Sequence, residues 1–171
     1  MRIVFATGNK DKMREIRQIL GGIDAQILSM KEAGVFEDVV EDGQSFSENA
    51  RIKADAIYEL LQEKEPEEAA QTIVLADDSG LEIDYFGGEP GIYSARYLGK
   101  DTPYTEKNSI ILQRLEGVAD EERTARFVCA IAARLPEGKK LDTIGKMEGR
   151  IAYSISGENG FGYDPIFFLP E

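Results

Sequence analysis

The first half of the chain alternates short apolar runs with stretches in which apolar residues recur at helical spacing. The runs at residues 2–6, 25–29 and 72–76 have the length and composition of buried strands. Over residues 13–20 and 45–62 the apolar positions fall on one face of a helix. An order of strand, helix, strand, helix and strand predicts an α/β protein.

Local signals place the ends of the two helices. Gly21 and Gly22 predict the end of the first helix. Ser45 and Glu48 have the S-x-x-E spacing of a capping box, which predicts that the second helix begins there. Residues 31–44 are polar and acidic with a few apolar positions, and we expect them to form mostly loop.

The second half of the chain is richer in strand signals. Residues 81–91 alternate apolar and polar positions and then turn at two glycines. Residues 102–117 have helical spacing, residues 125–135 and 140–152 are strand-like, and residues 166–169 form a last apolar run. Several adjacent strands after two strand–helix units predict a mixed β-sheet with flanking helices.

Length and net charge limit the classes of partner. A chain of 171 residues is long enough for one domain with a substantial core. Its net charge of −12 argues against binding to nucleic acid or anionic membranes, because both require a cationic face. No signal peptide and no apolar run of transmembrane length are recognisable, so we expect a cytoplasmic protein with no membrane partner.

The absence of histidine narrows the chemistry. It removes the usual general base, the Ser-His nucleophile and the usual zinc ligand. Catalysis would then use carboxylates, lysines, hydroxyls and backbone groups, and oxygen ligands favour Mg²⁺ or Mn²⁺. Cys129, the single cysteine, lies in an apolar strand-like run and is expected to be a buried small hydrophobic residue.

The turn after the first predicted strand is a candidate phosphate site. Backbone N–H groups at a helix N-terminus attract anions, and Gly8 would let a ligand approach the backbone closely. Thr7 and Asn9 add hydrogen-bonding groups, and Lys10 and Lys12 bring positive charge. The spacing is not that of a Walker sequence. The alternative is a plain strand–helix turn with Asn9 as the cap and solvated lysines.

Two pairs of acidic residues are candidate metal ligands. Glu41 and Asp42 lie in the predicted loop, whereas Asp77 and Asp78 follow the apolar run at residues 72–76, where we expect the strand to end. Adjacent carboxylates near a core are costly unless they reach solvent or a cation. They either point into solvent or hold a divalent cation that also contacts substrate phosphates, with one of them accepting a proton from water.

Residues 159–165, NGFGYDP, form a candidate site for a planar ligand. Gly160 and Gly162 flank Phe161 and would leave its ring accessible for stacking on a base. Asp164 precedes a proline and is therefore restricted to an extended or turn conformation. The alternative, favoured when this motif is taken alone, is a glycine-rich turn whose aromatic residues belong to the core.

Arg96 lies between two tyrosines in the tightly turned segment GGEPGIYSARYLG. Its guanidinium has three possible partners, which are a phosphate, a partner subunit or an acidic neighbour. The sequence does not rank them.

Five stretches occur together and in order between residues 6 and 168. They read ATGNKDKMREI, EDGQSFSENARIKA, ADDSGLEID, GGEPGIYSARY and GFGYDPIFF. In this combination the sequence resembles the inosine triphosphate pyrophosphatase family, whose members hydrolyse non-standard purine nucleoside triphosphates such as ITP, dITP and XTP. The resemblance implies an elongated α/β fold with two lobes around a central substrate cleft, and a homodimer. It also implies Mg²⁺-dependent cleavage of a nucleoside triphosphate to the monophosphate and pyrophosphate.

The resemblance implies roles for the residues at matching positions. Asp78 would be the proton acceptor and, with Glu41 and Asp77, a metal ligand. Contacts to substrate would come from Thr7, Gly8, Asn9, Lys10, Asp11, Lys12, Lys53 and Ser79. The segment that holds the base would be Phe161, Gly162, Tyr163 and Asp164, with Phe161 stacking. A cation and its bound phosphates would then explain why two aspartates follow an apolar run.

The sequence departs from the family pattern at its end. Family members continue into a segment with a lysine, a Ser-His-Arg motif and a final helix, and a chain without histidine has no such motif. In the family that segment recognises the 6-oxo edge of the base. We expect a truncated copy of a longer chain, the alternative being a natural short variant with weaker selectivity. Two other functions stay open, a weakened or inactive nucleotide-binding module and a Maf-like pyrophosphatase for modified nucleotides.

Overall fold

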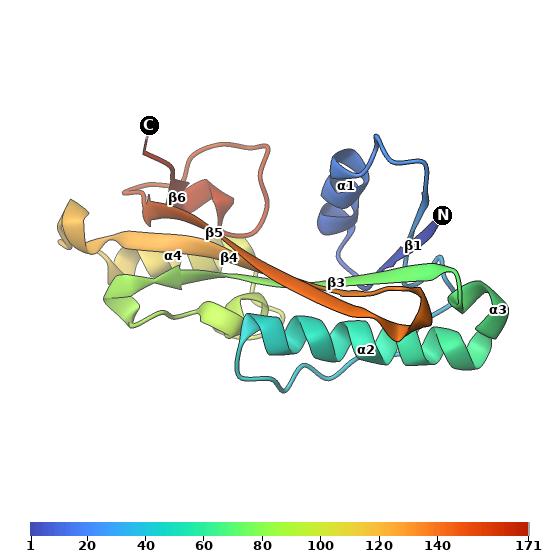
Figure 1. Ribbon diagram of the computed structural model, residues 1–171. Helices are drawn as coiled ribbons and strands as arrows, with labels where there is room; N and C mark the ends of the chain where they lie inside the picture. The colour runs from blue at the N-terminus through green and yellow to red at the C-terminus, as the bar shows by residue number, and fades with distance from the viewer. Residues whose placement is uncertain (171) are drawn as a thin grey trace. The chain divides into compact units, whose positions relative to one another are not determined.

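The computed structural model describes residues 1–170, which form a mixed α/β fold built on one six-stranded sheet (Figure 1). The strands are β1 (Arg2–Phe5), β2 (Gln26–Ser29), β3 (Thr72–Ile83), β4 (Thr124–Arg134), β5 (Lys140–Ile151) and β6 (Phe167–Phe168). Their order across the sheet is β2-β1-β3-β4-β5-β6. The helices are α1 (Lys10–Ile19), α2 (Phe46–Lys64), α3 (Pro66–Ala69) and α4 (Tyr104–Arg114). The predicted fold class is confirmed.

The chain divides into two compact units. The first unit contains Met1–Asp78 and Ala130–Ile144, and the second contains Ser79–Cys129 and Gly145–Glu171. Strands β3, β4 and β5 contribute residues to both units. Among the helices of residues 1–170, none combines the length and the apolar character that a membrane span requires. The single domain and the central cleft expected from the sequence stay predictions.

In the first unit, β1 is the centre of a parallel sheet. Ile3 is in register with Ile27 of β2 and with Ile73 of β3. Parallel neighbours need crossover connections, which α1 and α2 provide, and Figure 1 shows these two helices on opposite sides of the strands. The sheet and α2 bury the side chains of Ile3, Val4, Phe5, Ala50, Ala54, Ile57, Leu61 and Val74. Ser45 caps α2 as predicted, because its hydroxyl accepts the Glu48 N–H at 3.2 Å.

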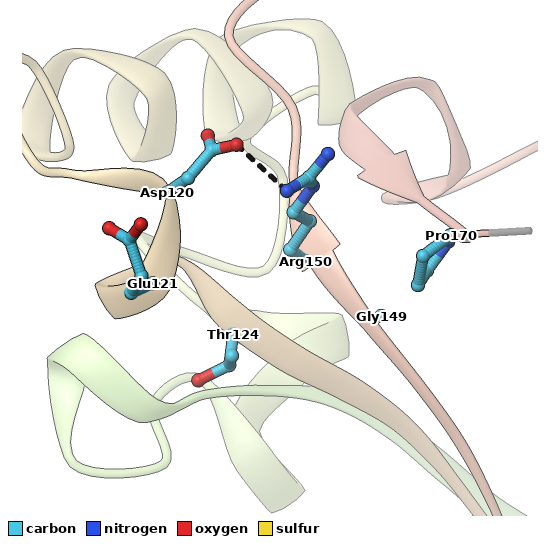
Figure 2. Close-up of a pocket in the computed structure, with 6 residues that line it drawn as sticks. All are labelled: Asp120, Glu121, Thr124, Gly149, Arg150 and Pro170. Carbon is cyan, nitrogen blue, oxygen red and sulfur yellow. Dashed lines mark hydrogen bonds and ion pairs between the residues drawn. The ribbon is translucent and has the colours of Figure 1, made fainter.

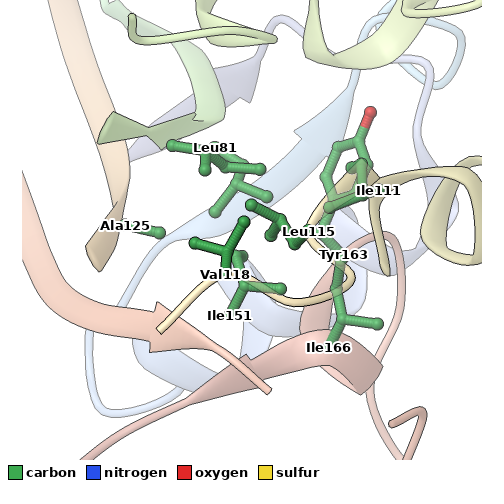
Figure 3. Close-up of a cluster of buried hydrophobic side chains, with 9 residues drawn as sticks. Leu81, Ile111, Leu115, Val118, Ala125, Ile151, Tyr163 and Ile166 are labelled. Atoms are coloured by element: carbon green, nitrogen blue, oxygen red, sulfur yellow. The ribbon is translucent and has the colours of Figure 1, made fainter. Parts of the chain in front are cut away.

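The second unit has its own hydrophobic cluster, drawn in Figure 3. Helix α4 and the turn after it supply Ile111, Leu115 and Val118, of which the first two lie on the face that the helical spacing predicts to be inward. The remaining buried members come from strands and from the C-terminal loop, and they are Leu81, Ile83, Ala125, Ile151, Tyr163 and Ile166. Short 3₁₀ helices punctuate this unit at Asp84–Phe86, Gly91–Arg96, Asp120–Glu122 and Asp164–Ile166.

Strand β3 corrects one prediction. The sequence suggested a strand at residues 72–76 that ends at the aspartate pair, followed by a separate strand at residues 81–91. The structure instead has one continuous strand, Thr72–Ile83, with Asp77 and Asp78 in its middle. Successive side chains of a strand point to opposite faces of the sheet. The two carboxylates therefore diverge, and their mutual repulsion does not end the strand.

Cys129 corrects a second prediction, because its side chain is exposed rather than buried. It lies on β4 between Val128 and Ala130, both of which are buried. Alternation along the strand sends Cys129 to the other face. The apolar run around it suggested burial on both faces, whereas β4 is only partly covered on that second face.

Candidate functional site

The turn between β1 and α1 is closed by its own polar side chains. Asn9 caps α1, and its side-chain oxygen accepts the N–H groups of Asp11 at 2.8 Å and Lys12 at 3.3 Å. The Asn9 N–H in turn donates to the hydroxyl of Thr7 at 3.1 Å. A Cβ built on Gly8 would meet nothing within 4 Å, so packing within the protein does not require glycine there. The Asn9 cap, which belonged to the alternative interpretation, is observed, and phosphate binding stays a prediction.

Asp77 is held by a lysine from α1. Its side chain is 6% exposed, and its Oδ2 lies 2.5 Å from the Nζ of Lys12. A buried carboxylate needs a cationic or hydrogen-bonding partner, because leaving water is costly for the charged form. Lys12 therefore neutralises Asp77 on the side of the sheet that α1 covers.

Asp78 is bound from α2. The Asn49 Nδ2 donates to Asp78 Oδ2 at 3.0 Å, and the Asn49 Oδ1 accepts the N–H of Gly43 at 2.9 Å. One buried amide thus joins the β3 carboxylate to the loop that precedes α2. The aspartate pair is separated by strand alternation and bound by partners from two different helices.

Lys53 connects the remaining acidic residue to the same strand. Its Nζ lies 3.1 Å from Glu41 Oε1 and donates to the backbone oxygen of Asp77 at 3.0 Å. Lys53 is only partly exposed, so its charge is incompletely screened by water. The loop residue Glu41 and the strand residues Asp77 and Asp78 are thereby brought into one cluster with Lys12, Asn49 and Lys53, which we call the first-unit cluster.

The charges of the first-unit cluster act on the protonation of Asp78. Burial raises the pKa of the Asp78 carboxyl above its ordinary value, and the negative charge of Glu41 raises it further. The Asn49 hydrogen bond and the positive charges of Lys53 and Lys12 lower the pKa of Asp78 and partly offset these effects. A carboxylate whose pKa is raised in this way is a stronger proton acceptor.

The donor set of the first-unit cluster fits a hard divalent cation. Mg²⁺ is usually bound by one or two carboxylates together with water and substrate phosphates, and the charge of Glu41 lies near enough to raise the pKa of Asp78. Within residues 1–170, no three or more Asp, Glu, Cys or His side chains are grouped so that they alone could hold a metal ion. The residues therefore suit a cation that shares its coordination with a phosphate, and binding stays a prediction.

The second unit contains the predicted base-binding segment as an ordered turn. The N–H of Phe161 donates to Asp164 Oδ2 at 2.9 Å, and a Cβ on Gly160 would lie 2.6 Å from the Asp164 Cβ. Glycine is therefore needed at position 160 to let the turn close. Gly162 adopts a left-handed conformation with a φ of 63°, which favours glycine. Phe161 is half-buried, so part of its ring is available for stacking.

Tyr163 belongs to the core of the second unit. Its ring packs edge-on against Tyr104 with centroids 5.1 Å apart, and its hydroxyl donates to the Ser94 backbone oxygen at 2.7 Å. Burial raises the pKa of this hydroxyl. The neighbouring Gly162 carbonyl accepts the Asn108 Nδ2 at 3.1 Å. For Tyr163 the core alternative from the sequence is the one observed, and a substrate contact by its ring stays a prediction.

Three further candidates lie outside these two arrangements. Asp42 is exposed, next to Glu41 in the loop. Ser79 follows Asp78 on β3 but belongs to the second unit. Arg96 is exposed, with its guanidinium 5.0 Å from the centre of the Tyr93 ring, a cation–π distance.

A cavity of about 340 Å³ lies elsewhere in the second unit (Figure 2). Its lining residues are Asp120, Glu121, Thr124, Gly149, Arg150 and Pro170. The Arg150 guanidinium pairs with Asp120 Oδ2 at 2.8 Å. The cavity includes none of the residues predicted to bind substrate or metal.

Comparison with known proteins gives the family. Residues 3–171 match a family model described as the Ham1 family. The chain belongs to the Ham1 family. A Clostridium perfringens protein named dITP/XTP pyrophosphatase is 45% identical over 99% of this chain and 82% of its own length. A Geobacter sulfurreducens protein of the same name is 44% identical over 99% of this chain and 81% of its own length.

Solved Ham1 structures have the same fold. The Staphylococcus aureus Ham1 protein matches with a TM-score of 0.81 and 37% identity, covering 99% of this chain and 82% of that one. A nucleoside-triphosphatase/dITP/XTP pyrophosphatase from Mycobacterium abscessus matches with a TM-score of 0.70 and 36% identity, covering 98% and 83%. The family resemblance recognised in the sequence is confirmed.

Two residues of this Ham1 chain were missed by sequence reasoning. Asn49 and Gly43 were not among the predicted site residues, although they connect Asp78 to the loop that carries Glu41. One signal was present, because asparagine is a weak helix former and Asn49 lies inside a long helix beside the apolar stripe. A polar residue kept at that position needs a partner, which the structure identifies as Asp78.

Proposed function

We propose that this Ham1 chain hydrolyses non-standard purine nucleoside triphosphates such as ITP, dITP and XTP to the monophosphate and pyrophosphate. The names of the Clostridium perfringens and Geobacter sulfurreducens relatives support this substrate class. The structural observation that carries the proposal is the first-unit cluster, in which Lys12 binds Asp77 on one face of β3 while Lys53 and Asn49 hold Glu41 and Asp78 from α2. Lysines beside carboxylates can bind phosphate and activate water at one site.

The lysines would receive the triphosphate. Lys53 is paired with the partly exposed Glu41 and can exchange it for a phosphate oxygen. Lys12 can donate a second N–H to a phosphate oxygen while it keeps the buried Asp77, because its ammonium has three donors. The N-terminus of α1 adds the partial positive charge of the helix dipole beside Thr7 and Asn9. Lys10 and Asp11 lie in the first turn of α1, where Lys10 adds charge and Asp11 pairs with Arg14 at 3.2 Å.

Asp78 would accept the proton of the attacking water. The water oxygen forms a bond to the α-phosphorus, and the bond from that phosphorus to the oxygen bridging to the β-phosphate breaks. Both electrons of the broken bond leave with pyrophosphate. The water proton passes to the Asp78 carboxylate and then to solvent, and the monophosphate remains.

A divalent cation, Mg²⁺ or Mn²⁺, bound by Glu41 and Asp78 with Asp77 as a further candidate, would neutralise negative charge on the phosphate oxygens. In the second unit, Phe161 would stack on the base, with Gly162, Tyr163 and Asp164 shaping that segment and Ser79 contacting substrate. The cytoplasmic location and the homodimer implied by the resemblance belong to the same proposal. Light scattering at micromolar protein concentration tests the dimer.

The test of function is pyrophosphate release in the presence of Mg²⁺ from ITP, dITP, XTP, ATP and GTP. Selective turnover of the first three, lost in Asp78→Asn, is the expected result. Turnover that Asp78→Asn leaves intact would remove Asp78 from the chemistry. Nucleotide binding without any turnover by the wild-type chain would contradict the proposed activity.

A further inference from the structure

We infer that Asn49 is a positioning residue that holds the Asp78 carboxylate in the orientation from which it accepts the water proton. The inference rests on the proposed function and adds to it a residue of α2 that acts through Asp78. Asn49 is 1% exposed, so its amide serves the protein interior.

The two ends of the Asn49 amide have fixed partners. The backbone N–H of Gly43 can only donate, so the oxygen of the Asn49 amide must face it, at 2.9 Å. The amide nitrogen must then face the other way, where it donates to Asp78 Oδ2 at 3.0 Å. The two contacts leave one consistent orientation of the amide, and that orientation binds one of the two oxygens of Asp78.

Gly43 keeps the loop close enough for this arrangement. A Cβ at position 43 would lie 2.8 Å from the Asn49 Oδ1 and 2.8 Å from the Glu48 Cβ. No side chain fits there without moving α2 or the loop, whatever its polarity. The loop at Gly43 and the Asn49 amide are therefore in close contact, and the same amide is hydrogen-bonded to the Asp78 carboxylate.

One turn after Asn49, helix α2 carries Lys53, which contacts other members of the first-unit cluster. Residues four apart on a helix lie on the same face, so Asn49 and Lys53 project together. Lys53 binds Glu41 and the Asp77 backbone oxygen while Asn49 binds the side chain of Asp78. A single helix thus holds both Glu41, a proposed metal ligand, and Asp78, the proposed proton acceptor.

The alternative is that Asn49 only braces the loop against α2. A brace requires the Gly43 contact alone, and its loss would weaken folding without depending on Asp78. A positioning role requires the second contact, and its loss matters only while Asp78 is a carboxylate. The two roles therefore differ in whether the effects of Asn49 and Asp78 substitutions are coupled.

The experiment is a double-mutant cycle on the full chain with Asn49→Leu, Asp78→Asn and the double variant. Steady-state ITP hydrolysis gives kcat, calorimetry gives nucleotide affinity, and thermal unfolding reports the fold. In the Asp78 background we expect Asn49→Leu to lower kcat by about 10- to 100-fold, the cost of a misplaced general base, with nucleotide affinity within about twofold. In the Asp78→Asn background we expect the same substitution to change kcat by less than about twofold.

Equal losses in both backgrounds would overturn the inference, because they would indicate a brace. Wild-type turnover that Asn49→Leu leaves unchanged would overturn it alone and leave the proposed function standing. No turnover by the wild-type chain would overturn the proposed function and this inference with it. Nucleotide affinity is also compared between Asp78→Asn and the double variant, in which turnover does not interfere with the measurement. The two affinities should be the same.

Discussion

The two units use their buried polar side chains in different ways. In the first unit they include pairs between two side chains, Lys12 with Asp77 and Asn49 with Asp78, besides contacts to the backbone. In the second unit they bind backbone carbonyls. Lys107 donates to Ala95, Asn108 to Gly162 and Tyr163 to Ser94, and Arg123 donates to Leu115, Ile151 and Ala152.

This difference separates side chains that can take part in catalysis from side chains that stabilise the fold. A lysine paired with a partly exposed carboxylate, as Lys53 is with Glu41, can release it for a phosphate, because water and the phosphate replace the lost partners. A guanidinium that satisfies three backbone oxygens has no such freedom, because those oxygens would be left buried without a donor. The first unit is therefore expected to lose activity when its polar residues are changed, and the second unit is expected to lose stability or loop order.

The largest expected effect is that of Asp78→Asn in the first unit. The amide has nearly the shape of the carboxylate but cannot accept the water proton, so kcat should fall by about 10² to 10⁴. Burial disfavours the charged form of Asp78, so the free energy of unfolding at neutral pH should be unchanged or higher than in the wild type. Activity assays and urea unfolding on the same preparation check both parts. A loss of stability together with activity would break the comparison between the units.

Arg123→Met in the second unit should have the opposite profile. Arg123 is 2% exposed, and its loss leaves three backbone oxygens without their donor. We expect the free energy of unfolding to fall by about 3 kcal/mol or more. Arg150→Met is the matched control, because the Arg150–Asp120 pair is partly exposed and should cost about 1 kcal/mol or less. Equal losses for the two variants would contradict a special role of the buried guanidinium.

Asn108→Leu sharpens the contrast with Asn49. Asn108 holds the Gly162 carbonyl of the predicted base-binding segment, so its loss should loosen that segment rather than the reacting groups. We expect KM for ITP to rise by about threefold to tenfold, the equivalent of one hydrogen bond, with kcat nearly unchanged. Steady-state kinetics of this variant beside Asn49→Leu give the measurement. A fall in kcat with KM unchanged would place Asn108 with the catalytic groups instead.

The smallest expected effect is a pH dependence that comes from Lys107. Lys107 is 1% exposed, and desolvation lowers the pKa of its ammonium below the ordinary 10.5. Between the lowered pKa of Lys107 and 10.5, this residue is protonated in the unfolded chain but not in the folded chain. The free energy of unfolding therefore rises with pH in this range. The wild type should therefore gain stability relative to Lys107→Met as the pH approaches 10.5. Urea unfolding gives the free energy of unfolding of both proteins at each pH. A difference between them that stays constant across alkaline pH would contradict the prediction.

Sequence patterns predicted correctly those features that depend on residues close together in the chain. The strand–helix alternation of residues 2–62, the Asn9 and Ser45 caps and the inward face of α4 all depend on residues close in sequence, and all are observed. Burial of Cys129 and the end of β3 at the aspartate pair were predicted wrongly. Both depend on which face of a strand is covered and on which distant groups neutralise a charge.

The candidate site shows the same division. Residue types that follow predicted strands or lie in the acidic loop supplied Lys12, Glu41, Asp77 and Asp78, and the family resemblance supplied Lys53. The sequence did not supply the pairing of Lys12 with Asp77, of Lys53 with Glu41, or of Asn49 with Asp78. Those pairings join residues up to 65 positions apart, and neither helical nor strand periodicity carries information over that range.

The sequence by itself determined the chemistry available to this protein, namely carboxylates, lysines and amides without histidine, and the elements that carry them. Only the tertiary structure decided which carboxylate each helix binds. Strand alternation sends Asp77 and Asp78 to opposite faces, and the packing of α1 on one side and α2 on the other then assigns a lysine to the first and an amide to the second.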